Sequence, residues 1–391
     1  MKRIYMDHAA TTPVDARVAA AMKPFLSQRF GNASSLHTFG QEAKEALEES
    51  RAAVARAIGA APDEIIFTSG GTESDNMALK GSLKRGDHLI TSAIEHHAVL
   101  HTAQYLEPQG VQVTYLPVDR FGLIDPADVE AAIKPNTKLV SIMHVNNEIG
   151  AIEPVAEIGV ICRRRGVLFH TDAVQGFGKL PIDVRKMNID MLSASAHKLC
   201  GPKGVGLLYI RNGIKLAPLM HGGGHERGRR SGTENVAGIV GFAKAMELAV
   251  KDMKKENAGM KTLSEKLVKR VLAIPDSHLN GHPQTSRLRG RPAKRLACIN
   301  NFRFAGIEGE SLVIHLDMQG VAASTGSACS SRSLEPSHVL TAIGLKHADA
   351  HGSLRLSLGR GNTAADVDYV AKVLPGIVEN LRRISPLAKG K

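Results

Sequence analysis

The sequence has no tryptophan, few aromatic residues and only four cysteines among its 391 residues. No apolar run reaches the length of a membrane-spanning helix, and the first residues lack the apolar stretch of a signal peptide. The few cysteines include no Cys-x-x-Cys pair, which argues against a disulfide framework or a zinc knuckle and suits a reducing compartment. We therefore expect a cytoplasmic protein without a membrane span.

The chain is strongly basic, with a formal net charge of +12. Arginine and lysine gather around Arg164, around Arg229 and between Arg287 and Arg295. Clustered cations can neutralise nucleic-acid phosphates, but aromatic residues make up only 4% of the chain and provide no base-stacking platform. We therefore expect a basic solvated surface, with 287–295 as a surface loop, and not a site for direct nucleic-acid binding.

Apolar runs of strand length alternate with helical lengths from residue 64 onward. The expected strands cover 64–68, 88–93, 112–118, 138–145 and 167–173, and the helices between them cover 72–84, 98–107, 126–134 and 154–165. This alternation is typical of a mostly parallel sheet flanked by helices. The run 204–211 is expected to add an antiparallel strand.

The remainder of the chain predicts a second, smaller unit. A helix expected at 41–58 precedes the alternating part, whereas this later part has expected helices at 234–271, 309–318 and 364–383 and strands at 298–304 and 354–358. We therefore predict an α/β protein with a large domain over 15–255. The segments 1–14 and 256–391 are expected to form a smaller α+β domain.

A glycine turn stands where the strand 64–68 passes into a helix. Gly70 and Gly71 allow a ligand to approach the backbone, and the free N–H groups at the helix start favour a phosphate. A plain turn with Thr72 as the helix N-cap is an equally good interpretation of these residues alone. The turn has neither the lysine of a P-loop nor the glycine spacing of a dinucleotide site, so nucleotide binding is disfavoured.

Asp172 and Lys198 are two further candidates for chemistry. Asp172 ends a predicted strand, where it could keep a pyridine nitrogen protonated or simply cap the next helix. Lys198 follows a run of small residues, and a buried ammonium is costly unless it serves a reaction such as Schiff-base formation with an aldehyde. Taken alone, however, a lysine usually lies on the surface. Ser195 and His197 beside Lys198 could bond a phosphate.

Cys329 has an unusual setting for a cysteine. It lies within 324–333, a stretch of small polar residues, whereas structural cysteines are usually surrounded by large apolar side chains. A reactive thiol and an idle exposed thiol both fit this setting, and the other three cysteines are expected to be structural. His97 and His101 have a helical metal-ligand spacing, but no further ligand is fixed nearby, so we expect no metal site.

In this order the motifs resemble those of cysteine desulfurases of the NifS/IscS type. These belong to the class V aminotransferase group of fold-type I enzymes, which use pyridoxal 5'-phosphate (PLP). The resemblance covers almost the whole chain. The matching segments are 7–13 (DHAATTP), 31–37 (GNASSLH), 95–96 (EH), 144–150 (HVNNEIG), 196–198 (AHK), 222–227 (GGGHER), 230–233 (RSGT), 326–329 (GSAC) and 354–360 (LRLSLGR).

The resemblance implies a role for each matching residue, with the large domain holding PLP and the small domain carrying the Cys329 loop. Lys198 would attach covalently to PLP, Asp172 would pair with the pyridine nitrogen, and His96 would stack on the ring and move protons. Arg355, together with Asn147, would hold the substrate carboxylate. The implied cofactor-binding residues are Gly71, Thr72, His96, Asn147, Asp172, Gln175, Ser195, His197, Lys198 and, from the partner subunit, Thr233.

The resemblance also implies an activity and partners. L-cysteine would give L-alanine and a persulfide on Cys329, which is then passed to an iron–sulfur scaffold or a tRNA-thiolation enzyme. Because Thr233 would serve the other subunit, a homodimer is expected. The alternatives are a selenocysteine lyase or another class V PLP aminotransferase. The tail 385–391 is shorter than the extension with which housekeeping relatives dock their scaffold, so the sulfur acceptor stays open.

Overall fold

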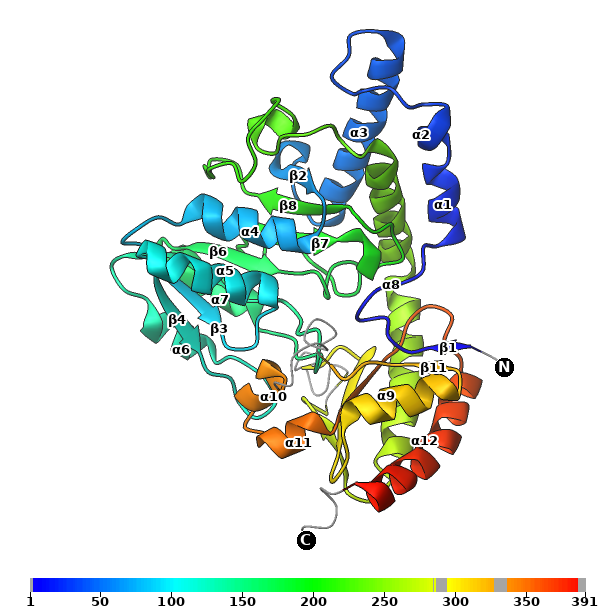
Figure 1. The fold of residues 1–391 in the computed structure, drawn as a ribbon. Helices are drawn as coiled ribbons and strands as arrows, with labels where there is room; N and C mark the ends of the chain where they lie inside the picture. Colours follow the sequence, from blue (N-terminus) through cyan, green and yellow to red (C-terminus); the bar gives the residue numbers. More distant parts are fainter. Residues whose placement is uncertain (1–2, 284, 286–293, 327–335, 386–391) are drawn as a thin grey trace.

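A seven-stranded sheet and a three-stranded sheet organise the chain in a computed structural model that describes residues 3–283, 285, 294–326 and 336–385 (Figure 1). In spatial order the larger sheet contains β2 (Ile65–Thr68), β8 (Gly206–Ile210), β7 (Met191–Ser195), β6 (Leu168–Asp172), β5 (Thr137–Ser141), β3 (His88–Ser92) and β4 (Gln112–Leu116). β8 runs antiparallel to both of its neighbours, and the other neighbouring strands are parallel. The structure thus confirms a mostly parallel α/β sheet and the antiparallel strand expected within 204–211.

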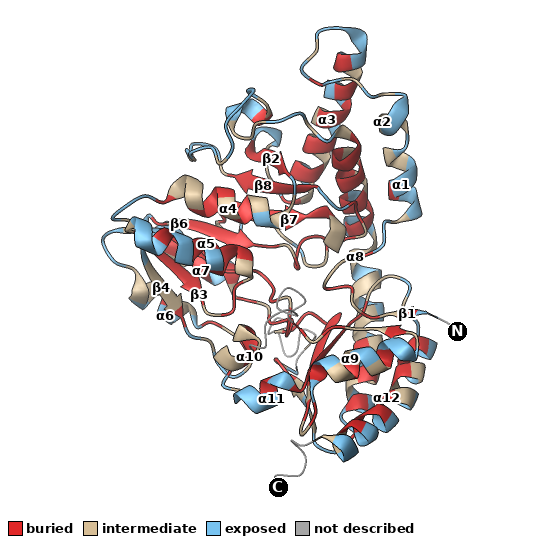
Figure 2. Ribbon diagram, viewed as in Figure 1, coloured by how far each residue is buried: buried red, intermediate tan, exposed pale blue. Residues whose placement is uncertain are grey.

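Alternate residues of the large sheet face two different hydrophobic cores. Ile65 and Phe67 lie in one core, with residues of α3 (Thr38–Ala57), α7 (Val155–Arg165) and the first part of α8 (Val236–Val271). Ile66 lies in the other core, with residues of α4 (Gly71–Ser82) and α5 (His97–Leu106). This alternation follows from the two-residue period of a strand. Because both faces of this sheet are covered, its inner strands are largely buried, whereas the edge strand β4 is mostly only partly buried, as Figure 2 shows.

The smaller sheet is antiparallel and forms a second part of the structure. It contains β12 (Ser353–Ser357), β10 (Ile299–Phe304) and β9 (Ser277–Asn280). Helices α9 (Gly309–Met318) and α12 (Ala364–Ile384) pack with it, and the short strands β1 (Ile4–Tyr5) and β11 (Val321–Ala322) pair in parallel beside them (Figure 1). The elements expected for an α+β unit are therefore present.

Helix α8 connects the two parts. It has 36 residues and a length of about 54 Å at 1.5 Å per residue. Phe242 lies in the core of the large sheet, whereas Leu267 and Val271 lie in the core of the small one. The domain boundary expected after residue 255 falls inside this helix and stays a prediction. No helix in the described part of the chain, α8 included, is long and apolar enough to cross a membrane.

Several elements differ from the sequence expectation. β7 was not expected, because its Met-Leu-Ser-Ala-Ser sequence lacks the β-branched and aromatic residues typical of strands. The short helices α1 (Ala16–Met22), α2 (Pro24–Ser27), α10 (His338–Ala342) and α11 (His347–His351) were also not expected. The strand expected over 138–145 ends at Ser141, because the following residues turn toward the cavity described below.

The basic stretch 287–295 was expected to be a surface loop, and this is wrong at Arg295. The Arg295 side chain is buried, and its guanidinium donates to the carbonyl oxygens of His282 at 2.8 Å and Ile299 at 2.5 Å. It also donates to Oδ1 of Asn300 at 2.9 Å. Hydrogen bonds to carbonyl oxygens allow this cation to be buried, although the charge of the sequence segment alone predicts a solvent-exposed position. Arg287, Arg289 and Arg291 lie outside the described residues.

Candidate active site

A cavity of about 290 Å³ lies at the carboxyl ends of the parallel strands, where ligands gather in such sheets. All of the predicted site residues that the structure describes, except Thr233, line it. Its walls include Gly71, Thr72, His96, Asn147, Asp172, Gln175, Ser195, His197, Lys198 and Arg355, together with Asp75, Glu148 and Gly326. Cys329 lies outside the described residues. The fold therefore brings together side chains that are far apart in sequence.

Lys198 stands in the single turn of 3-10 helix, Ala196–Lys198, that follows β7. Its Nζ donates to the carbonyl oxygens of Ala9 at 2.6 Å and Ala10 at 2.7 Å. Burial, followed by the nearby cations Lys179 and Arg355, lowers the pKa of Lys198 to about 7. A large fraction of this amine is thus neutral near pH 7, which a nucleophilic amine requires.

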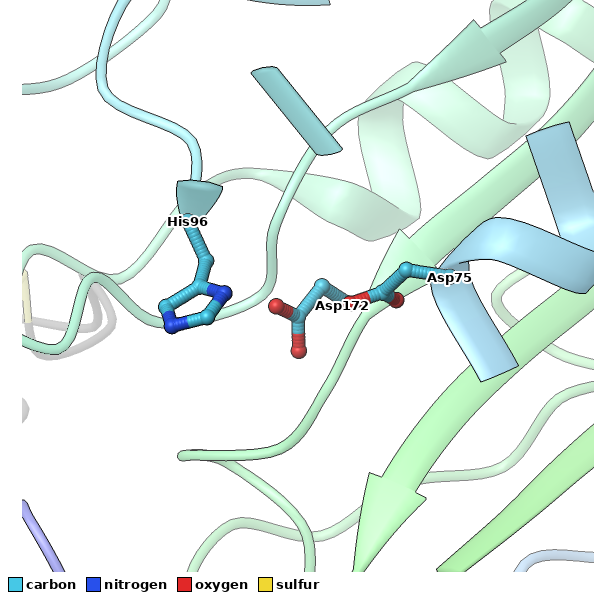
Figure 3. Close-up of side chains that lie close together, drawn as sticks. All are labelled: Asp75, His96 and Asp172. Carbon is cyan, nitrogen blue, oxygen red and sulfur yellow. The ribbon is translucent and has the colours of Figure 1, made fainter. Parts of the chain in front are cut away.

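Asp172 ends β6, and Asp75 of α4 lies beside it (Figure 3). Burial raises the pKa of Asp172 to about 6, while the Val174 N–H, 2.9 Å from Oδ1, favours the charged form. Burial and the adjacent Asp172 raise the pKa of Asp75 well above its usual range. His170, 3.6 Å from Asp75, has its pKa lowered to about 3 by burial and is neutral. At neutral pH, Asp172 therefore carries the negative charge of the pair and Asp75 retains its proton.

His96 faces Asp172 from the start of α5 (Figure 3). Its Nδ1 accepts the N–H of Ala98 at 3.1 Å, which places the proton of the neutral ring on Nε2. Burial, followed by the charge of Lys198, lowers the pKa of His96 to about 4, so the ring is uncharged at neutral pH. One side-chain nitrogen or oxygen atom from each of His96, Asp75 and Asp172 lies within 4.8 Å of the other two. The cavity thus has a neutral ring next to a buried carboxylate.

The glycine turn at the start of α4 forms another wall of the cavity. Gly70, the N-cap residue, has no side chain that could cap the first helical N–H groups. A Cβ atom at Gly71 would lie 2.6 Å from Cγ2 of Val174, so only glycine allows this close approach. Ser195 and His197 line the same cavity, and burial lowers the pKa of His197 to about 4. Uncapped N–H groups and polar side chains together suit a phosphate.

Arg355 reaches the cavity from β12 of the smaller sheet. Its Nη1 donates to the carbonyl oxygens of Asn147 at 2.9 Å and Gly326 at 2.7 Å, and its Nη2 donates to Asp7 at 2.9 Å. Its buried Nε has no hydrogen-bond partner among the described residues. A guanidinium held in this way at the cavity wall can bind an anionic group such as a carboxylate.

Thr233 is exposed and does not line the cavity of its own chain. Two ion pairs hold the segment before it. Glu226 is buried, pairs with Arg51 at 2.7 Å and also accepts the N–H of Phe67 at 2.8 Å. Arg230 pairs with Glu73 of α4 at 2.8 Å. The position of Thr233 is thus fixed relative to the glycine turn, while its role toward a partner subunit stays a prediction.

The sequence analysis missed two ionisable residues at this site, Asp75 and Lys179. Asp75 shares the buried face of α4 with Met77, Ala78 and Leu79. A carboxylate on an apolar helical face is a signal that could have identified it. Lys179 follows Gln175 by four residues, but no pattern in the sequence indicates that its ammonium is enclosed.

Asp75→Asn is expected to stabilise the PLP-free protein increasingly as pH rises above about 4. Asp75 keeps its proton in the folded wild type because its pKa is raised, whereas it ionises in the unfolded chain. The wild type therefore loses stability as the pH rises above the unfolded-state pKa. Asparagine has no such ionisation. A melting-temperature gain on the order of a few degrees at neutral pH, absent near pH 4, is the expected result in calorimetry.

Asp183→Asn is the matched control, because the expected change has the opposite sign. The N–H and ammonium groups of Lys186 lower the pKa of the half-buried Asp183 carboxyl. Its stabilising effect is present above the unfolded-state pKa, so the asparagine variant should lose stability at neutral pH compared with acid pH. If Asp75→Asn also lost stability on going from acid to neutral pH, the buried carboxyl would be ionised and our assignment wrong.

Comparison with known proteins gives matches over nearly the whole chain. The family model described as aminotransferase class V matches residues 4–370. A curated relative from Methanosarcina thermophila, "Cysteine desulfurase IscS", is 54% identical over 390 residues, 99% of this chain and 94% of that protein. Among solved structures, a "NifS-like protein" is 40% identical with a TM-score of 0.88, covering 97% of this chain and 100% of that chain. "SspA in complex with cysteine" is 40% identical with a TM-score of 0.80, covering 91% and 99% of the two chains.

Proposed function

This chain belongs to the class V aminotransferase family, and on that basis we propose that it is a PLP-dependent cysteine desulfurase. The observation that carries the proposal is the presence, in one cavity, of the Lys198 amine, the buried carboxylate of Asp172 and the Arg355 guanidinium. The name of the M. thermophila relative and the cysteine bound to the SspA structure support the same reaction.

The cavity fits PLP at each of the groups that this cofactor presents. An amine with a pKa near 7 suits the aldehyde, and a buried ionised carboxylate suits the pyridine nitrogen. An uncapped helix start with a required glycine suits the phosphate. Oδ1 of Asp75, beside Asp172, is buried and has no hydrogen-bond partner among the described residues. We infer that Lys198, Asp172, His96, Gln175 and the glycine turn hold PLP.

When bound, PLP supplies an electron sink for breaking bonds at the substrate amino acid. Lys198 would hold the cofactor, and its amine, which is largely neutral near pH 7, can move a proton. His96 keeps its proton on Nε2, the ring atom not used by the Ala98 N–H, and can donate it within the cavity. Asp172 keeps negative charge beside the cofactor nitrogen, with Asp75 protonated behind it.

Arg355 and Asn147 are proposed to bind the carboxylate of L-cysteine. The backbone carbonyls of Asn147 and Gly326 and the carboxylate of Asp7 fix the guanidinium, so little side-chain entropy remains to be lost on binding.

Arg355→Lys is expected to raise KM for L-cysteine by about tenfold or more, because one charged hydrogen bond is worth roughly 1.5–3 kcal/mol. Lysine keeps the charge but loses the forked donors and the contacts to Asn147 and Gly326. Steady-state kinetics with the PLP-loaded protein measure KM and kcat separately. Arg303→Lys is the control, since Arg303 lies on β10 outside the cavity lining. An unchanged KM in Arg355→Lys would exclude Arg355 from substrate binding.

Cys329 is proposed to accept the sulfur atom. Its thiolate takes the sulfur of L-cysteine, the carbon–sulfur bond breaks, and a sulfur–sulfur bond forms, so that L-cysteine and a thiol give L-alanine and a persulfide. Cys329 lies outside the described residues, but Gly326, three residues before it, lines the cavity. On the other side, Ser337 donates at 2.5 Å to Glu148, another lining residue. The described residues on both sides of the Cys329 segment thus contact the cavity wall.

The sulfur acceptor, the assembly and the location belong to the same proposal. A persulfide can be transferred to another thiol, so an iron–sulfur scaffold or a tRNA-thiolation enzyme is the expected class of partner, and the name of the M. thermophila relative fits the first. We propose a homodimer because Thr233, anchored through Arg230 and Glu73, is exposed and available to a second copy. A cytoplasmic protein remains our expectation.

The test of this function is product analysis with three substrates. PLP-loaded protein and a reductant are incubated with L-cysteine, L-selenocysteine, or L-alanine plus a 2-oxo acid. A cysteine desulfurase gives equal amounts of alanine and sulfide from L-cysteine. Activity restricted to L-selenocysteine would support the lyase alternative, and amino-group exchange with the 2-oxo acid without sulfide release would support an aminotransferase. Either of these results would overturn the proposal.

A further inference from the structure

A second lysine, Lys179, lies half-buried next to Lys198. Lys179 lines a small cavity of about 70 Å³ that Lys198 and Gln175 also line. Within the described part of the chain, the hydrogen-bond partner of its ammonium is Oε1 of Gln175, at 3.2 Å, and no carboxylate pairs with it. Burial lowers the pKa of Lys179. An ammonium in such a place is costly and needs a reason.

A chain of hydrogen bonds leads from Lys179 to the reactive amine. Lys179 donates to Oε1 of Gln175, and Nε2 of Gln175 donates to the Ala9 carbonyl oxygen at 2.8 Å. The same carbonyl oxygen accepts from Nζ of Lys198 at 2.6 Å. Because an ammonium can only donate, it determines which end of the Gln175 amide is oxygen and which is nitrogen. The donor end of Gln175 is thereby directed toward Ala9 and the active-site cavity.

A side chain of helix α8 holds the backbone of Lys179 in this place. Nδ2 of Asn257 donates to the Lys179 carbonyl oxygen at 2.8 Å. Asn257 and the neighbouring Met260 also line the small cavity. The position of Lys179 is therefore fixed by the helix that connects the two parts of the protein.

The charges around Lys198 come from several elements. Lys179 and Arg355 oppose a positive charge on it, and Asp7 and Asp172 favour one. The imidazoles that face Lys198 are uncharged near pH 7, since burial lowers the pKa values of His96 and His197 to about 4. After burial, the charge of Lys179 contributes most to lowering the pKa of the Lys198 amine. A neighbouring cation is a known way of keeping a lysine amine neutral and nucleophilic.

We propose that Lys179 is a positioning residue of this active site, which orients the Gln175 amide through a hydrogen bond and, by its positive charge, keeps the Lys198 amine ready for attachment of PLP. The inference rests on the proposed function, because it assumes that Lys198 binds this cofactor. It adds a residue whose side chain contacts Gln175 and is absent from the lining of the larger cavity. Removing Lys179 should therefore change the state of Lys198 without removing a group that touches PLP.

The test measures how fast PLP attaches to the cofactor-free protein at different pH values, followed by the appearance of yellow colour. In the wild type the rate should rise with pH through about 7, as Lys198 loses its proton. In Lys179→Met the midpoint should move upward by about one pH unit, because one like charge at close range is removed. Lys179→Gln should show the same movement, since it keeps a donor for Gln175 but lacks the charge.

Lys179→Arg is the conservative variant and should keep the midpoint near the wild-type value, because it keeps both charge and donor. Melting temperature and elution volume show whether each variant is folded, and the glutamine variant is the most conservative in size. A wild-type midpoint in folded Lys179→Met and Lys179→Gln would overturn the inference while leaving the proposed function intact. A wild-type protein that takes up no PLP would instead overturn the proposed function, and the inference with it.

Discussion

Replacing Cys329 with alanine is expected to abolish sulfur transfer from L-cysteine while leaving the PLP-bound protein yellow. The alanine variant keeps Lys198, Asp172 and the glycine turn, which are proposed to hold the cofactor, but lacks the thiol that would accept sulfur. Loss of an enzyme's nucleophile removes most of its rate enhancement, so sulfide release should fall by roughly a thousandfold or more. Absorbance measures cofactor content, and the rate of sulfide release measures the reaction.

Cys162→Ala is the matched control, since it also removes one thiol. Cys162 is buried, and burial raises its pKa to about 12, so its thiol is inert at neutral pH. Its alanine variant should keep the wild-type rate per bound PLP, with at most some loss of stability. Wild-type sulfide release by Cys329→Ala would show that Cys329 is not the nucleophile, and a lyase-type reaction would then replace the proposed one.

Replacing Lys198 with alanine is expected to remove covalent attachment of PLP and nearly all activity. Lys198 lies in the cavity with a pKa of about 7, next to the Ala9 and Ala10 carbonyl oxygens. Loss of a positioned acid–base group alone costs about a hundred- to ten-thousandfold in rate, and loss of the attachment point adds to this. Borohydride reduction followed by peptide mass spectrometry locates any lysine that is linked to PLP.

The control for this experiment is Lys203→Ala, because Lys203 is exposed and lies outside the cavity lining. It should leave the labelled peptide and the rate unchanged. If reduced PLP were found on another lysine in the wild type, or still found in stoichiometric amount on the Lys198→Ala protein, the assignment of Lys198 would be wrong.

The sequence could predict the part of the site that depends on the large sheet. Asp172 ends β6, a predicted strand, and parallel topology brings the ends of such strands to one edge. The glycine turn follows β2 for the same reason. Gly71 in this turn lies against Val174, and a Cβ atom at position 71 would clash with the valine side chain. This contact explains why position 71 is a glycine. Lys198 follows β7, which was not predicted, so the resemblance and not the strand pattern placed it at this edge of the sheet.

The remaining groups depend on packing that no local pattern encodes. Arg355 reaches the cavity because the smaller sheet docks against the end of the larger one, and Asp7 comes from the N-terminal segment to pair with it. Asp75 and Lys179 are ionisable groups whose pKa values are set by burial. The resemblance to a family placed Arg355 in the site, whereas periodicity and charge did not.

Arg295 shows how charge alone can mislead. A run of arginines suggests a solvated loop, yet Arg295 is enclosed by acceptors from His282, Ile299 and Asn300. Burial also lowers the pKa of Arg295 to about 10, which still leaves it charged at neutral pH. Its hydrogen bonds, and not its membership of a basic run, determine where it lies.

The most direct test of the account is a single turnover without reductant. PLP-loaded protein is mixed with one equivalent of L-cysteine per subunit. Alanine is then quantified, and the mass of the peptide that contains Cys329 is measured by mass spectrometry. The account predicts alanine in an amount equal to the sulfur gained, with one added sulfur atom on Cys329 and none on Cys162. Alanine formed without added sulfur on Cys329, or no alanine at all, would contradict it.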